Sequence, residues 1–247
     1  MTTRPAPAPH IPDATSDALP TSWQRLLALS GILFALLFVV GWFTTGGVTP
    51  HYTEPDQEWT NWAQDNQWNG RISGFLMLLA GFVFLYFMGA IRSAFGSGES
   101  PLRGSGQLAR VVFGGALTGM AGMAIASVTL AAASTNGADV DPVVSKAVAT
   151  ASGGPFLVAT MGFAAFLMAA GLLTLRTGVF PRWTGIVALI GAVSFLVALL
   201  TVIDGTTDGS PFGYAFFPAI LSLVIWTGAT SVSRYRAMGT ERAVTAA

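Results

Sequence analysis

Six stretches of this chain contain no Asp, Glu, Lys or Arg, and this feature limits its fold more than any other. They run over residues 26–53, 72–91, 111–138, 147–175, 183–203 and 209–233. Each reaches the length of about 20 residues that an α-helix needs to cross ~30 Å of hydrocarbon. A soluble protein can bury one such run, but a chain of 247 residues cannot keep six of them from water. The sequence therefore predicts an integral membrane protein.

Composition agrees with this prediction and excludes several classes of function. Only 10% of the residues are charged, against about 25% in soluble domains. The 12 basic and 12 acidic residues cancel, so no basic field indicates a nucleic-acid partner. The chain has no cysteine, which excludes disulfides, thiolate metal sites and cysteine nucleophiles.

The predicted fold class is all-α, a polytopic transmembrane bundle of six spans. In lipid each span must satisfy its own backbone hydrogen bonds, which favours helices, and the alternating segments of a β-barrel are absent. We expect a disordered cytoplasmic tail over residues 1–22, a transmembrane domain over 23–233 and a second cytoplasmic tail over 234–247. The spans are expected at about 26–45, 72–92, 111–133, 155–175, 183–203 and 213–233.

The distribution of charge predicts the orientation of the bundle. If the N-terminus is cytoplasmic, ten of the twelve basic residues fall in cytoplasmic segments, and only Arg71 and Lys146 fall outside. Eight of the twelve acidic residues fall outside. Because basic residues favour the cytoplasmic side, we expect both termini there.

The longest outer segment, residues 44–70, contains a short helix according to its pattern. Pro55 suits the start of a helix, and Trp59 and Trp62 share one face. Since tryptophan favours headgroup depth, we expect an interfacial helix over about 55–66. It serves as an anchor or lid over the bundle, or its tryptophans contact a ligand or lipid.

Small residues recur every four positions in the third span, at Gly114, Thr118, Gly122 and Ala126. Such a pattern lets helices approach closely, either within the bundle or at the face of a homo-oligomer or protein partner. In the sixth span, Pro218 is expected to kink the helix.

Residues that carry chemistry are few and lie at the outer rim. His51 and Glu54 make a weak metal pair, and the segment from Asp204 to Asp208 resembles the start of an EF-hand loop but lacks its twelfth-position Glu. A membrane enzyme would have to use the rim residues His51, Glu54, Asp56, Arg71 and Asp204. We predict no catalytic, cofactor-binding or metal-binding residue.

Within the spans the polar groups are hydroxyls, which do not titrate near neutral pH. Coupled transporters and proton pumps keep ionisable residues in their spans, so proton-coupled transport is disfavoured. We expect the hydroxyls to bond between helices. They are Thr118, Ser127, Thr160, Ser194, Thr201, Ser222 and Thr227.

Two segments resemble a known family. They are the outer run PDQEWTNWAQDNQWNGRISGFLMLLAGFVFLYFMGAIRSAF and the turn LRTGVFPRWTGIVALIGAV, which contains a P-R-W-x-G motif at Pro181, Arg182, Trp183 and Gly185. Over about residues 25–232 the chain resembles a family of six-span membrane proteins of high-GC bacteria, whose function is unknown. The resemblance implies the six-helix architecture and supplies no catalytic residue.

Three classes of function stay open from the sequence. The leading one is a non-catalytic integral membrane protein with an accessory, lipid-interacting or assembly role. The alternatives are a facilitator for a small neutral or apolar solute, and a membrane enzyme with an outer-rim site. The expected location is the bacterial cytoplasmic membrane, with the lipid bilayer as partner.

Overall fold

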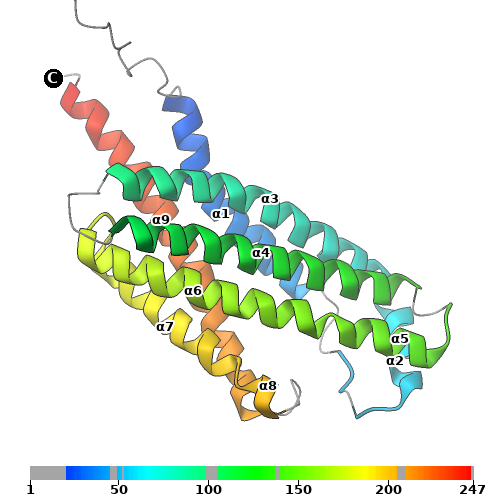
Figure 1. Cartoon of the computed structure of the whole chain (residues 1–247). Coiled ribbons are helices and arrows are strands. Elements are labelled where there is room, and N and C mark those ends of the chain that lie inside the picture. The colour runs from blue at the N-terminus through cyan, green and yellow to red at the C-terminus, as the bar shows by residue number, and fades with distance from the viewer. Residues whose placement is uncertain are drawn as a thin grey trace, which may run out of the picture.

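The computed structural model describes residues 21–44, 49–51, 53–97, 105–136, 139–204 and 210–245. Within these residues the chain is helical, without strands (Figure 1). The six long helices are α1 (Thr21–Phe43), α3 (Gln67–Ser97), α4 (Ser105–Asn136), α6 (Gly153–Thr177), α7 (Arg182–Ala198) and α9 (Phe216–Thr245). The shorter ones are α2 (Asp56–Asp65), α5 (Pro142–Ala151), α8 (Thr201–Asp204) and the 3₁₀ turn η2 (Pro211–Ala215).

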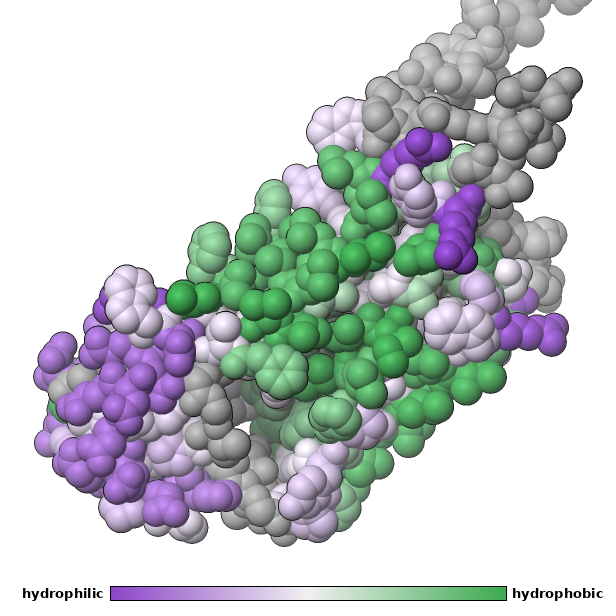
Figure 2. All heavy atoms as spheres, turned by 180° about the vertical axis from the view of Figure 1, so that it is seen from behind, coloured by the Kyte–Doolittle hydropathy of each residue, from purple (hydrophilic) through white to green (hydrophobic). Residues whose placement is uncertain are grey.

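Six segments of the described chain are long and apolar enough to cross a membrane, as the sequence predicts. They range from 19 residues in Arg25–Phe43 to 36 in Pro142–Thr177, which joins α5 and α6. At 1.5 Å per residue the longest segment extends about 54 Å, well beyond ~30 Å of hydrocarbon. Several helices therefore project past the apolar layer, which Figure 2 shows as a hydrophobic middle region with hydrophilic residues gathered at one end.

The six long helices form a closed ring in chain order. Each packs against the next, and α9 packs against both α7 and α1. Neighbouring helices in the chain therefore run antiparallel, and the start of α1 and the end of α9 lie at the same end of the molecule (Figure 1).

Local sequence explains where the helices around α6 begin and end. The Asp141 carboxylate accepts a 2.9 Å hydrogen bond from the Val143 amide and caps α5. Pro155 lies in the first turn of α6, where proline is tolerated. α6 ends at Gly178, whose φ of 66° needs a glycine.

One local expectation is wrong. Pro218 is the third residue of α9, after η2, so the kink expected inside the sixth span is absent, because a proline in the first turn leaves the helix intact. The apolar segment of the fifth span covers Arg182–Ile203, close to the expected 183–203, and a turn separates α7 from α8 within it. α9 continues past residue 233, where the tail is expected to begin, to Thr245.

Aromatic side chains fill the centre of the ring. Trp226 of α9 is fully buried, and its ring centroid lies 5.1 Å from that of Phe166 and 6.1 Å from that of Phe87. Phe84 continues this packing to Phe166 at 5.8 Å and to Phe34 of α1 at 4.5 Å. Trp226 thus packs inside its span, and the rings of four helices form one solid core.

Candidate functional site

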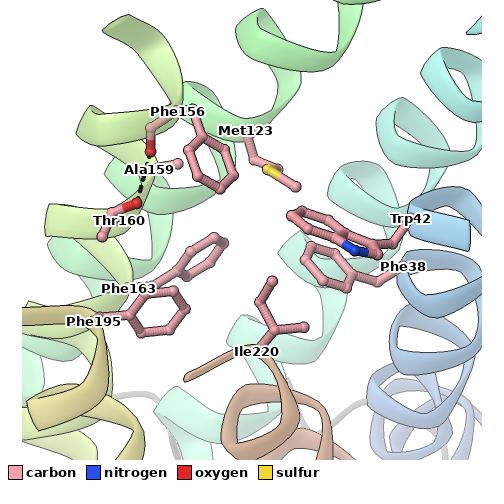
Figure 3. A pocket seen from close by; sticks show the side chains of 9 residues that line it. All are labelled: Phe38, Trp42, Met123, Phe156, Ala159, Thr160, Phe163, Phe195 and Ile220. Atoms are coloured by element: carbon pink, nitrogen blue, oxygen red, sulfur yellow. Dashed lines mark hydrogen bonds between the residues drawn. The ribbon is translucent and has the colours of Figure 1, made fainter. Parts of the chain in front are cut away.

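One hollow enters the bundle in the part of the ring that holds the end of α1 and the start of α6. It is lined by Phe38, Trp42, Met123, Phe156, Ala159, Thr160, Phe163, Phe195 and Ile220, side chains of α1, α4, α6, α7 and α9 (Figure 3). Its free space is about 10 Å³, which is about what one water molecule needs.

The hollow has an apolar wall. Thr160 is its one hydroxyl, and this group donates to the Phe156 carbonyl oxygen at 2.9 Å, within its own helix (Figure 3). At the rim the Trp42 ring lies 6.1 Å from that of Phe156, and 36% of the Trp42 surface is exposed. A wall of this kind suits an apolar group rather than a charged or strongly polar one.

A cap formed by α2 and α5 lies beside the C-terminal end of α4. The Trp59 and Trp62 side chains are buried, and Trp59 clusters with Ala133 of α4 and Ala149 of α5. The sequence indicates the helix, but its tryptophans face the protein rather than lie at the membrane surface. The reason is that α4 and α5 continue far enough to offer an apolar surface of their own.

Lys146 fastens this cap. Its Nζ lies 3.0 Å from the Asp56 carboxylate and donates to the Glu54 carbonyl oxygen at 2.9 Å. Lys146 is the one lysine of the chain, and this is the signal that could have singled it out. The bond between Lys146 and Glu54 joins α5 to the segment before α2, and its two residues are 92 positions apart in the chain.

The other rim residues do not gather around Asp56. Arg71 donates from Nε to the Thr135 hydroxyl at 3.3 Å and lies 5.4 Å from the Trp68 ring centroid. His51 is exposed. The Asp204 side chain and the whole of Asp208 lie outside the described residues. Among the described residues, no group of three His, Asp or Glu side chains is placed to hold a metal ion.

Of the mid-span hydroxyls, several bond to their own helix instead of bridging two helices. Thr160 donates to the Phe156 carbonyl oxygen at 2.9 Å, and Thr227 to that of Leu223 at 2.9 Å. A bridging bond comes from a serine that the sequence analysis did not single out. Ser73 of α3 is buried and donates to the Gly41 carbonyl oxygen of α1 at 2.7 Å.

The small-residue pattern of α4 serves packing within the bundle, and its register differs from the expected one. An added Cβ at Gly122 would come within 2.5 Å of the Ala159 nitrogen, whereas Gly114 has open space around it. The proposed oligomer face of Gly114, Thr118, Gly122 and Ala126 is therefore partly covered, since Gly122 and Ala126 are buried. The contact with α6 follows Gly115, Gly119 and Gly122 instead.

The arginines at the opposite end from the cap are arranged differently from Arg71 and Lys146. Within the described part of the chain, six of them make no hydrogen bond or ion pair to the protein, whereas Arg236 of α9 does have a contact. We call this the arginine-rich end, and define it by Arg25, Arg92, Arg110, Arg176, Arg182 and Arg234.

The fold and its surface define a multi-pass helical membrane protein that contacts the lipid bilayer through its apolar helices. The family described as "Domain of unknown function (DUF4386)" matches residues 29–229, and the chain belongs to this family. No curated protein and no solved structure matches the chain.

Proposed function

We propose that this protein is a non-catalytic, lipid-interacting membrane protein whose working surfaces are the outside and the ends of the bundle. The observation that carries the proposal is the filled interior of the ring. Rings of Phe34, Phe84, Phe87, Phe166 and Trp226 pack at centroid distances of 4.5 to 6.1 Å. Within the described residues, such a core offers no aqueous path for a solute.

The outward faces support the lipid-interacting part of the proposal. Every long helix exposes large apolar side chains that a bilayer would cover. Examples from the six helices are Leu36, Phe82, Ile125, Val158, Ile190 and Leu221, each between 46% and 60% exposed.

The hollow next to Trp42 favours a second candidate, a facilitator or carrier for a small apolar solute. Its wall is apolar, but its free space of about 10 Å³ must enlarge before it accepts anything larger than water. Pro218 and Trp62 do not line it.

The two candidates separate in one reconstitution experiment. The protein in liposomes is tested for the flux of small neutral and apolar solutes, and the purified protein is analysed by mass spectrometry for retained lipid. We expect a flux within about twofold of protein-free liposomes and at least one lipid retained per chain. A clear flux would overturn the proposal, as would the absence of retained lipid.

A matched pair of variants identifies the source of any flux. Ala159→Leu places extra atoms in the hollow, because Ala159 lines it and is buried. Val158→Leu places a leucine on the exposed side of the same helix instead. A flux that Ala159→Leu abolishes and Val158→Leu preserves would assign the facilitator function to the hollow.

A further inference from the structure

We propose that the arginine-rich end binds the phosphate of an anionic phospholipid between α1 and α9, with Arg25 as the main donor. This inference rests on the proposed lipid-interacting function and names the headgroup chemistry.

The cations at the two ends of the molecule differ in their hydrogen-bond acceptors. At the cap end, both described cations find acceptors within the protein, Arg71 at Thr135 and Lys146 at Asp56 and Glu54. At the arginine-rich end, the six defining arginines find none among the described residues. A guanidinium carries five N–H donors, and a lipid phosphate is an acceptor that suits them.

Arg25 of α1 contacts an aromatic ring of α9. Its guanidinium carbon lies 5.8 Å from the ring centroid of Tyr235 on α9, close enough for a cation–π interaction. Its Nε is buried without a hydrogen-bond partner. Tyr235 thus contacts the side chain, and because Nε itself is buried, the phosphate would be bound by the two terminal amino groups of the guanidinium.

A close contact between α1 and α9 forms the proposed phosphate site. At Gly31 of α1, an added Cβ would collide with the Ser231 hydroxyl of α9. This close approach fixes the start of α1 beside the part of α9 that carries Arg234 and Tyr235. The start of α1 and the end of α9 lie together at one end of the ring (Figure 1).

Arg25 lies at the depth of the lipid headgroups and close to a second positive charge. Trp23, two residues before Arg25, is 54% exposed, and exposed tryptophans mark headgroup depth. Arg25 is therefore at the level of lipid phosphates. An arginine fork matches a phosphate with two parallel hydrogen bonds, and the nearby Arg234 favours a lipid with net negative charge over a zwitterionic one.

Native mass spectrometry of the full-length protein tests the proposal. The protein is titrated with equal amounts of phosphatidylglycerol and phosphatidylcholine that carry identical acyl chains, so that only the headgroups differ. We expect preferential binding of phosphatidylglycerol. Arg25→Gln should lower this preference about fivefold, the effect of one arginine near an anionic surface.

Arg110→Gln is the matched control, because Arg110 lies at the same end on α4, is exposed and has no ring contact in the described structure. It should change the preference less than twofold. Equal effects of the two variants would show a diffuse positive field and overturn the site. Tyr235→Leu should lower the preference as well, whereas Tyr235→Phe, which keeps the ring, should not.

Four further outcomes are decisive. Arg25→Lys keeps the charge but not the fork, so its preference for phosphatidylglycerol should lie between those of the wild type and Arg25→Gln. This variant also tests the site if Arg25→Gln folds poorly. Displacement of phosphatidylglycerol by a tenfold excess of inorganic phosphate would assign the site to a free anion and overturn the lipid assignment. Lipid binding without headgroup preference would overturn this inference and leave the proposed function standing, whereas no lipid binding would overturn both.

Discussion

Gly115 of α4 lies so close to Gly162 of α6 that a Cβ added at Gly115 would come within 2.8 Å of the Gly162 carbonyl oxygen. The same added atom would lie 2.6 Å from the Phe166 nitrogen. The contact is between backbones, so no side-chain rotation relieves it. Small residues thus let these two helices pack without intervening side chains, as in other membrane bundles.

Gly115→Ala should therefore destabilise the protein, by about 1–3 kcal/mol as overpacked interiors do. The neighbouring Gly114→Ala meets open space and should be neutral or stabilising, because alanine favours the helix by up to about 1 kcal/mol. Thermal unfolding in detergent measures both. Equal destabilisation by the two variants would contradict the α4–α6 register.

Trp226→Ala should be among the most damaging single changes. It empties the centre of the core, where the side chain is fully buried, and large-to-small changes of this kind cost about 3–5 kcal/mol. Trp183→Ala is the control, since 51% of the Trp183 surface is exposed. A smaller loss of unfolding temperature for Trp226→Ala than for Trp183→Ala would contradict the described core.

Lys146→Met should loosen the cap and leave the bundle intact. The ion pair with Asp56 is partly exposed, with side-chain exposures of 25% and 42%, so its contribution to global stability is at most about 1 kcal/mol. The local effect is larger, because the Glu54 contact is lost with it. Hydrogen exchange in α2 should accelerate while that in α6 stays unchanged, and an unchanged α2 would contradict the fastening role.

The orientation of the chain has a direct test, since the chain lacks cysteine. Single cysteines at Thr3 and Thr245 should resist an impermeant maleimide in intact cells, whereas one at Gln57 should react. Labelling of either terminal position would contradict the proposed cytoplasmic termini.

The long helices could be predicted from the sequence because each is defined locally, by a charge-free run of sufficient length. The family resemblance over residues 25–232 is likewise confirmed by the family match over 29–229. The helix faces were harder to predict, since apolar residues surround every span and no amphipathic pattern separates core from lipid. For this reason Gly114 and Gly115 could not be distinguished.

The site residues depend on contacts between distant segments, which no local pattern records. Nothing near Trp42 predicts Phe156 as its neighbour 114 positions later in the chain. Similarly, Trp59 and Trp62 have a pattern typical of an interfacial helix, and only the length of α4 and α5 turns them towards the protein.

Cysteine accessibility inside the ring tests the central claim, that the interior is closed to water. Single cysteines at Ala164, Ala192 and Leu223, which are buried, are treated in native membranes with a charged methanethiosulfonate reagent, with a cysteine at the exposed Gln57 as positive control. We expect the reagent to modify the cysteine at Gln57 and none of the three interior cysteines. Reaction at the interior positions in folded protein would show a water-filled path and contradict the account.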